Sequence, residues 1–383
     1  MAGQKARELR AAGRDIVGLT SGEPDFDTPE NVTEAVVRAM SQSKTKYTDV
    51  GGVPELKAAI QAKFHRDNRL EYATNEIIVG TGAKQIIFNA LMCTVDDGDE
   101  VIIPAPYWVS YPDIVLLTGG TPIFVPCAPG NQFKLTPEDL DQAITPATRW
   151  LVLNAPNNPS GATYTRAELK GLSEVLLRHP QVWIMTDDIY EHILYDGRHF
   201  ATIAEIEPAL KQRTLTINGV SKAYAMTGWR IGYGGAPSTL VKAMVKLQSQ
   251  STSNPSSISQ AAAVEALNGP QGFIAKRTQI FQERRDKVVG WLNETKGISC
   301  HSPEGAFYVF PSCAGVIGRK TPTGQVVSSD GDFIQYLLDS QNLAVLQGDA
   351  YGVSPFFRIS FATSIEQLEE GCTRLKRACE ALF

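Results

Sequence analysis

The sequence predicts an α/β protein with a large domain, built on a mostly parallel sheet covered by helices, and a smaller α+β domain. The chain has 383 residues, of which 43% are hydrophobic and 20% charged, which favours two domains over one. From about Asn75 to about Asn218, short apolar runs alternate with helical patterns, as is typical of a parallel sheet with helices on both faces. The C-terminal part changes to short strands and longer helices, which favours an α+β domain.

The expected elements of the large domain follow one another closely. Thr28 as N-cap and Pro29 at the first helical position begin a helix to about Met40, and Pro54 begins another to about Asn68. The expected strands are Glu76–Gly80, Val101–Ile103, Ile123–Val125, Trp150–Asn154, Val182–Thr186 and Thr214–Asn218. The helices expected between them are Ala83–Cys93, Pro137–Ile144 and Arg166–Arg178.

The remaining segments predict the smaller domain. Ser249–Ser259 is rich in serine and predicts a loop, followed by long helices to about Lys296. Short strands are expected near Ala306–Phe310, Leu343–Leu346 and Phe357–Phe361, and helices near Asp332–Ser340 and Ile365–Leu382. We expect residues 31–283 to form the large domain, and residues 1–30 with 284–383 to form the small one.

The charge, the cysteines and the apolar runs of the sequence limit which partners and which cellular location are expected. A formal charge of −5 with interspersed signs argues against binding to nucleic acid or an anionic membrane. The six cysteines show no C-x-x-C spacing, which favours reduced thiols in the cytoplasm. The N-terminus is polar from the start and no run of about 18 apolar residues occurs, so neither a signal peptide nor a membrane span is expected.

The segment Ser221–Tyr233 carries the most informative residues for function. Ser221 directly precedes Lys222, and Arg230 follows in the same segment. Such a lysine can carry an aldehyde cofactor as a Schiff base, and its neutral amine can then move a proton between substrate and cofactor carbons. Because most lysines are solvated surface charges, the prediction depends on the residues that accompany Lys222.

Three polar clusters each follow a predicted strand. Asn154–Gly161 follows the first and would, alone, be a Pro-Asn turn. Asp187, with Tyr190 shortly after it, ends the second and could alone be a helix cap. Ser221 and Lys222 follow the third. Because ligands bind at the carboxyl edge of a parallel sheet, we expect the three clusters to form one site.

This edge can supply what pyridoxal 5'-phosphate needs from a protein. Lys222 would form the Schiff base, and Asp187 would keep the ring nitrogen protonated. Asn158 and Tyr190 would donate to the phenolic oxygen, which lowers the pKa of the Schiff base by stabilising its deprotonated form. Trp108 is the candidate to stack on the ring, with a core aromatic as the alternative.

Gly80–Lys84 lies between a predicted strand and a predicted helix and is the candidate phosphate site. Backbone N–H groups and the helix N-terminus can bind an anion there, and the residues expected to contribute are Gly82, Ala83 and Lys84. The segment lacks the third glycine of a dinucleotide fingerprint, and the chain has no nucleotide-binding P-loop motif. Ser221 and Arg230 would add a hydroxyl and a fixed charge.

Arg358 stands inside the apolar run Phe357–Phe361. A charge in such a strand is costly unless it is paired, and a guanidinium fork suits the carboxylate of an amino acid. A structural ion pair is the alternative.

Together these residues resemble the class I aminotransferases of the fold type I pyridoxal phosphate enzymes, and within them the bacterial-type aspartate aminotransferases. The motifs that carry the resemblance stand in the family's order and span the chain: Gly22–Phe26, Lys46-Tyr47, Pro106–Trp108, Asn157–Gly161, Asp187 with Tyr190, Ser221-Lys222 with Arg230, and Arg358.

The resemblance implies further roles. Tyr47 would reach the phosphate in the partner subunit's site, which implies a homodimer with shared active sites. Gly22 would offer its N–H to the substrate carboxylate that Arg358 holds, and Trp108 and Asn158 would also contact the substrate. Lys84 would bind the distal carboxylate of an acidic substrate, with a solvated lysine at a helix start as the alternative.

The implied reaction is transfer of the amino group from L-aspartate to 2-oxoglutarate, giving oxaloacetate and L-glutamate by a ping-pong mechanism in which Lys222, Asp187 and Tyr190 are catalytic. The family's usual basic N-terminal segment is missing, so prephenate and aromatic amino acids stay open as substrates. A C–S lyase would keep Arg358 but would not need Lys84. A ligand-sensing regulator would need a DNA-binding module, and no basic helix-turn-helix precedes residue 20.

Overall fold

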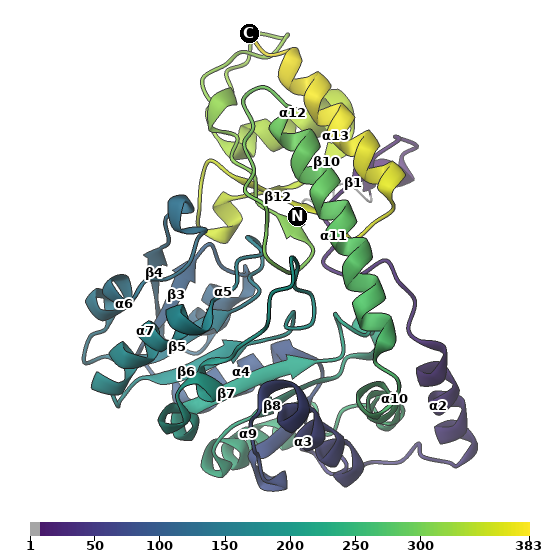
Figure 1. Ribbon diagram of the computed structural model, residues 1–383, viewed down its shortest axis with the longest axis vertical. Coiled ribbons are helices and arrows are strands. Elements are labelled where there is room, and N and C mark those ends of the chain that lie inside the picture. The colour runs from purple at the N-terminus through teal and green to yellow at the C-terminus, as the bar shows by residue number, and fades with distance from the viewer. Residues whose placement is uncertain (1–7) are drawn as a thin grey trace.

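A seven-stranded sheet organises the larger part of the molecule, in the lower half of Figure 1. The computed structural model describes residues 8–383. The strands are β2 (Ile77–Gly80), β3 (Glu100–Ala105), β4 (Thr121–Pro126), β5 (Thr148–Asn154), β6 (Trp183–Asp187), β7 (Thr214–Gly219) and β8 (Gly232–Gly235). Their order is β2-β8-β7-β6-β5-β3-β4, and only the pairs made by β8 are antiparallel. The expected mostly parallel sheet is confirmed.

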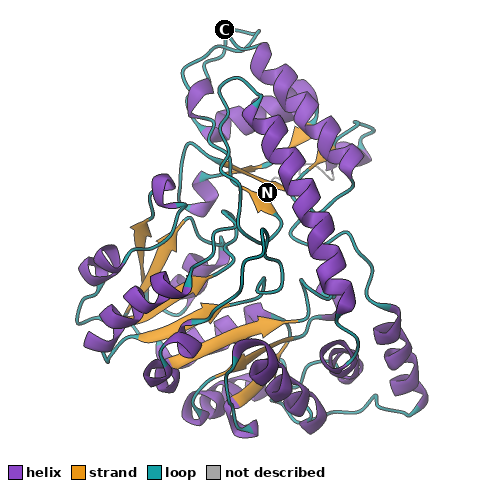
Figure 2. Ribbon diagram, viewed as in Figure 1, coloured by secondary structure: helices purple, strands orange, loops and turns teal. Residues whose placement is uncertain are grey.

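Helices cover both faces of this sheet (Figure 2). Alternate residues of one strand enter different cores: Trp150 and Val152 pack on one face, and Leu151 and Leu153 on the other. The helices of this part are α2 (Glu30–Ser41), α3 (Pro54–Asn68), α4 (Ala83–Thr94), α5 (Ser110–Leu117), α6 (Pro137–Ala143), α7 (Arg166–Arg178), α8 (Ile203–Ile206), α9 (Ser238–Ser251) and α10 (Ser257–Asn268). A strand buried on both faces is apolar throughout, which is why the sequence showed apolar runs without alternation.

Strand β8 was not predicted, because glycine is rare in strands. Its sequence is Gly-Tyr-Gly-Gly. A Cβ at Gly232 would lie 2.0 Å from the backbone nitrogen of Ala83, and one at Gly235 would lie 2.5 Å from the ring of Tyr72. The glycines therefore let α4 and the ring of Tyr72 approach the sheet closely.

Two expectations about helix ends were wrong. Thr28 does not cap α2, because its hydroxyl donates to the carbonyl of Ala225 instead, and Pro29 stands at the cap position. The serine-rich stretch is not one loop: α9 continues to Ser251 and α10 begins at Ser257. Ser256 accepts a hydrogen bond from the N–H of Ser259 and so caps α10, a use of serine that composition alone does not distinguish from a loop.

The smaller part contains two short sheets and the last helices. Strands β9 (Tyr308–Val309), β11 (Leu346–Gln347) and β12 (Phe357–Ser360) form an antiparallel sheet in the order β11-β12-β9. Strand β1 (Val17–Gly18) pairs parallel with β10 (Leu343–Ala344), so the N-terminal segment joins the C-terminal one. Helices α12 (Asp330–Gln341) and α13 (Ile365–Glu380) pack beside these strands. The expected α+β character of this region agrees with these elements.

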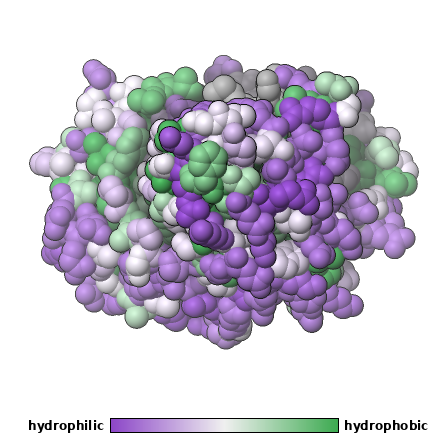
Figure 3. All heavy atoms as spheres, turned by 90° about the horizontal axis from the view of Figure 1, so that it is seen from above, coloured by the Kyte–Doolittle hydropathy of each residue, from purple (hydrophilic) through white to green (hydrophobic). Residues whose placement is uncertain are grey.

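Helix α11 (Gly272–Asn293) runs from the large sheet region to the upper part in Figure 1. The predicted boundary between residues 283 and 284 falls inside this helix, so the division into two domains stays a prediction. Seen from above in Figure 3, the surface is mainly hydrophilic, with hydrophobic residues in small groups. Among residues 8–383, no helix combines the length and the apolar character needed to cross a membrane.

Candidate active site

A cavity of about 480 Å³ lies at the carboxyl ends of β5, β6 and β7, between the large sheet and the strands of the smaller part. Its lining includes most of the residues predicted from the sequence: Gly22, Ala83, Lys84, Trp108, Asn158, Asp187, Tyr190, Ser221, Lys222, Arg230 and Arg358. The three polar clusters that follow separate strands therefore do meet at one edge of the sheet, as strand direction requires.

Lys222 is one of the residues that line this cavity. Its ammonium donates to the carbonyl of Gly22 and lies 5.8 Å from the ring centre of Tyr190. Burial, followed by the positive charge of Arg358, lowers the pKa of Lys222 to about 8, against the opposing effect of Glu23. An amine with this pKa is partly neutral near pH 7 to 8, as a nucleophile or a proton carrier must be.

Asp187 is buried with one oxygen unpaired. Its Oδ2 accepts a hydrogen bond of 2.7 Å from the hydroxyl of Tyr111, whereas its Oδ1 has no hydrogen-bond partner. Burial raises the pKa of this carboxyl, and the bond from Tyr111 opposes that rise. A buried carboxylate oxygen without a donor is costly, so this side chain fits a ligand that brings a cationic N–H.

The amide of Asn158 and the phenol of Tyr190 both line the cavity. The side-chain oxygen of Asn158 accepts a 2.9 Å hydrogen bond from Nη1 of Arg358, and its backbone N–H donates to the side chain of Asn154. The hydroxyl of Tyr190 lies 2.9 Å from that of Tyr308. Each of these side chains keeps hydrogen-bonding capacity for a ligand.

The start of α4 forms a cradle for an anion. Gly82 has φ +85°, and a Cβ there would lie 2.2 Å from Nη2 of Arg230, so glycine lets the guanidinium lie against the chain. Arg230 itself donates to the carbonyls of Thr227 and Thr81, at 2.8 and 3.4 Å. Backbone N–H groups, an arginine and the Ser221 hydroxyl together suit a phosphate.

Lys84 extends over Trp108 at the rim of the cavity. Its Nζ lies 4.7 Å from the centre of the indole. Partial burial and the nearby charge of Arg230 lower the pKa of Lys84. The ammonium therefore lies over an aromatic ring beside the cavity. Lys84 is an exposed residue, so its contact with a distal carboxylate stays a prediction, with a solvated lysine as the alternative.

Arg358 is 5% exposed and occupies strand β12. Besides its bond to Asn158, its Nη2 donates to the carbonyl of Thr20 at 2.8 Å, while Nε is buried without a partner. No acidic side chain is recorded as an ion-pair partner of Arg358 within residues 8–383. The structural ion pair considered as its alternative role is therefore not observed in the described part of the chain.

Known proteins are similar to this chain in sequence and in structure. The family described as "Aminotransferase class I and II" matches residues 14–375. A probable aspartate/prephenate aminotransferase of Rhizobium leguminosarum bv. phaseoli is 58% identical over 99% of this chain and 94% of its own length. An aspartate aminotransferase of Rhizobium meliloti (strain 1021) is 57% identical over 99% of this chain and 93% of its own length.

The chain belongs to the class I and II aminotransferases. Solved structures agree: the aspartate aminotransferase from Rhizobium meliloti matches with a TM-score of 0.98 and 56% identity, over 100% of this chain and 96% of that one. The Thermus thermophilus enzyme, solved with maleate, matches with a TM-score of 0.92 and 40% identity, over 98% of this chain and 95% of that one. The resemblance inferred from the motifs and the fold type are confirmed.

Two predicted site residues of this aminotransferase do not line the cavity. Gly82 lies behind it, against Arg230. Tyr47 is 92% exposed and lines a different surface pocket, together with Thr252, Ser253 and Asn254. Within one chain, Tyr47 therefore does not line this cavity.

Several residues of the cavity were not predicted. They are Glu23, Val109, Tyr111, Ile189, Thr227, Tyr308, Leu346 and Tyr351, whereas Asn154 lines the cavity as part of the predicted cluster Asn154–Gly161. Tyr111 lies in α5, and its hydroxyl joins the site through Asp187, a partner far away in sequence that no local pattern indicates. Tyr308 stands in a predicted apolar strand, where an aromatic residue normally predicts core packing.

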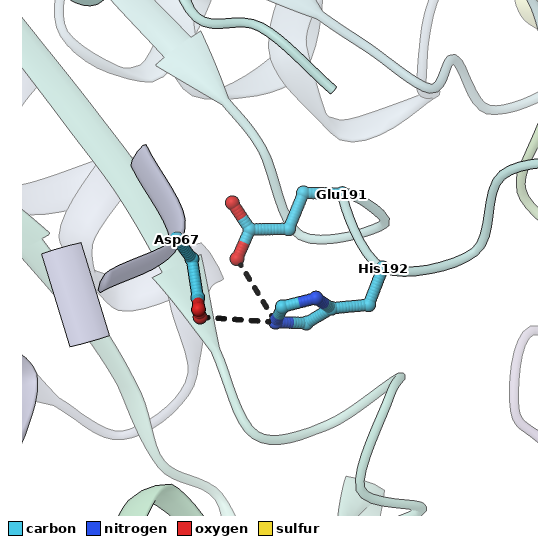
Figure 4. Close-up of side chains that lie close together, drawn as sticks. All are labelled: Asp67, Glu191 and His192. Carbon is cyan, nitrogen blue, oxygen red and sulfur yellow. Dashed lines mark ion pairs between the residues drawn. The ribbon is translucent and has the colours of Figure 1, made fainter. Parts of the chain in front are cut away.

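A second group of ionisable side chains, Asp67, Glu191 and His192, lies outside this cavity (Figure 4). Nε2 of His192 lies 3.2 Å from Oε1 of Glu191 and 3.5 Å from Oδ2 of Asp67. Glu191 also pairs with the ammonium of Lys63, which is 1% exposed. A metal ion would have to share Glu191 with that ammonium, so we interpret the group as an ion-pair network that fixes the loop after Tyr190.

Proposed function

We propose that this aminotransferase transfers the amino group of L-aspartate to 2-oxoglutarate, with pyridoxal 5'-phosphate as its cofactor. The observation that carries the proposal is the convergence, in one cavity, of the Lys222 amine, the unpaired Oδ1 of Asp187 and the buried guanidinium of Arg358. Relatives that are more than half identical and are named aspartate or aspartate/prephenate aminotransferases support it.

The donor set fits this cofactor. Lys222 would hold its aldehyde carbon, the unpaired oxygen of Asp187 would accept from its ring N–H, and the cradle of Ala83, Ser221 and Arg230 would hold its phosphate. Trp108 would stack on the ring. When bound, pyridoxal phosphate supplies an electron sink for the bond that breaks at the substrate α-carbon.

The protein itself provides the proton carrier. The amine of Lys222, with its pKa near 8, would take the proton from the substrate α-carbon and deliver it to the cofactor carbon that carried the aldehyde, and it would make the reverse transfer for the 2-oxo acid. In the chain without cofactor, this amine donates to the carbonyl of Gly22. Asp187, buried and acting through a hydrogen bond, would favour the positively charged form of the ring nitrogen.

Arg358 and Lys84 would select the substrate. The guanidinium of Arg358 would form two parallel hydrogen bonds with the α-carboxylate, to which Gly22 would add its N–H. Lys84, whose Nζ lies over the ring of Trp108, would pair with the distal carboxylate of aspartate or glutamate. The Thermus thermophilus structure was solved with maleate, a dicarboxylate, which supports a site for two carboxylates.

We further propose a homodimer in which Tyr47 reaches the partner's phosphate site. Its 92% exposure and its distance from the cavity of its own chain support this role. We also propose the division into residues 31–283 and residues 1–30 with 284–383, and a cytoplasmic location, which the six unpaired cysteines support.

A panel of amino donors tests the function, with 2-oxoglutarate as acceptor and glutamate as the product measured. Aspartate should give the highest kcat/KM. Lys84→Ala should lower kcat/KM for aspartate at least tenfold more than for alanine, because only aspartate has the distal carboxylate. Lys376→Ala, on the exposed face of α13, is the control and should change neither.

Two results would overturn the assignment. Release of pyruvate and ammonia from a thio-amino acid, without glutamate formation from any donor, would indicate a lyase. Equal losses for aspartate and alanine in Lys84→Ala would remove the role of Lys84. Because two relatives are named aspartate/prephenate aminotransferases, prephenate belongs among the acceptors as the second candidate function.

A further inference from the structure

Tyr308 lines the cavity and contacts both Tyr190 and Arg358. It occupies β9, is fully buried, and pairs in register with Ser360 of β12, two residues after Arg358. Its hydroxyl lies 2.9 Å from the hydroxyl of Tyr190, which follows β6 of the large sheet. Its ring lies 4.3 Å from the guanidinium carbon of Arg358. One side chain thus contacts both the predicted cofactor contact and the predicted substrate contact.

The protons available to the two phenols determine which one donates in the hydrogen bond between Tyr190 and Tyr308. A phenol has one proton to donate, although its oxygen can accept. If Tyr190 donates its proton to the phenolic oxygen of the cofactor, as the proposed function requires, its own oxygen can only accept from Tyr308. Tyr308 would then make Tyr190 a stronger donor, because hydrogen bonds in a chain polarise one another.

The ring of Tyr308 packs against the guanidinium of Arg358 and limits its orientation. The guanidinium lies over this ring and, at 5.4 Å, over that of Tyr351, while Asn158 and the carbonyl of Thr20 accept from its two terminal nitrogens. A planar cation held against an aromatic face keeps a fixed plane. A substrate carboxylate can then make two bonds without reordering the arginine.

We propose that Tyr308 is a positioning residue with two separable roles: its hydroxyl donates to Tyr190, and its ring fixes the plane of Arg358. The proposal rests on the proposed function, since it assumes a cofactor that accepts from Tyr190 and a substrate carboxylate bound by Arg358. The two roles can be tested separately, because phenylalanine keeps the ring and removes only the hydroxyl.

The first test is a pH titration of the visible absorbance of the cofactor-loaded Y308F enzyme. Without the second donor, the deprotonated form of the bound cofactor is less stabilised, so the midpoint should rise by roughly 0.3–1 pH unit. The dissociation constant for maleate and the KM for aspartate should stay within about twofold, because the ring still contacts Arg358.

The second test removes the ring as well. Y308L should show the same shift of midpoint and, in addition, a rise of about tenfold in the maleate dissociation constant and in the KM for aspartate. If Y308L does not fold, Y308M replaces it with an unbranched side chain. Y72F is the matched control: it removes another buried hydroxyl pair, 3.0 Å from Thr216 and outside the cavity. It should move neither readout.

An unchanged midpoint in Y308F would overturn the role of the hydroxyl. Unchanged maleate binding in the ringless variant would overturn the role of the ring. A shift of either readout in Y72F as large as that in Y308F would show that loss of a buried hydroxyl alone produces it, and would overturn the assignment to Tyr308. If the unsubstituted protein binds no cofactor that absorbs visible light, the proposed function fails first.

Discussion

Replacing Arg358 by lysine should raise the KM for every amino donor while keeping the formal charge of the site. Arg358 is 5% exposed, and its two terminal nitrogens donate to Asn158 and to the carbonyl of Thr20 at 2.9 and 2.8 Å. Its fork can offer a carboxylate two parallel hydrogen bonds, whereas one ammonium cannot reproduce that geometry. A charge-assisted hydrogen bond contributes about 1.5–3 kcal/mol, so losing one should raise KM roughly 10- to 150-fold.

Steady-state kinetics with aspartate and with alanine measure this effect. Both donors have the α-carboxylate, so their losses should agree within about threefold, in contrast to the unequal losses expected for Lys84→Ala. Arg166→Lys is the control, because Arg166 pairs with Glu205 at the surface. The KM of this variant should not change for either donor. A rise of less than about threefold in Arg358→Lys, or a loss confined to aspartate, would refute the assignment of Arg358 to the α-carboxylate.

Two further predictions concern other parts of the chain. Pyridoxal phosphate should attach to the cofactor-free protein faster as the pH rises, with the rate levelling off above about pH 8. The reason is that the pKa of Lys222 is lowered to about 8, chiefly by burial, and only its neutral amine reacts. A stopped-flow rate that is independent of pH from 6 to 9 would contradict this. Glu191→Gln should lower the free energy of unfolding by about 3–5 kcal/mol in urea titrations, because Lys63, 1% exposed, would keep a buried charge without its partner. The control is Glu71→Gln, because the pair of Glu71 with His65 is exposed. It should lower the free energy of unfolding by less than about 1 kcal/mol. Equal losses in the two variants would show that burial of the pair is unimportant.

Strand direction made the central site predictable. Asn154, Asp187 and Ser221-Lys222 each end or follow an apolar run, and parallel pairing necessarily brings such ends together. Local patterns also located most helices: Pro54–Asn68 and Arg166–Arg178 were predicted with the bounds that the structure has. In these cases the determining interactions are local in sequence or follow from the periodicity of one strand.

What depends on contacts between distant segments was not predictable. The glycines of β8 are explained by the closeness of α4 and Tyr72, which a single strand does not reveal. Tyr111 and Tyr308 enter the site only through partners far away in sequence, Asp187 and Tyr190. The pairing of Lys63 with Glu191 likewise joins α3 to the loop after β6. A buried tyrosine or lysine has the same local sequence signature whether its polar end meets a core partner or a ligand.

The proposed function depends above all on which lysine carries the cofactor, and this can be measured. The protein loaded with pyridoxal phosphate is reduced with borohydride, digested, and mapped by mass spectrometry. The reduced cofactor is expected on the peptide containing Lys222, and Lys222→Ala is expected to lose both this label and turnover. Label on Lys84 or on another lysine, or full turnover in Lys222→Ala, would contradict this expectation.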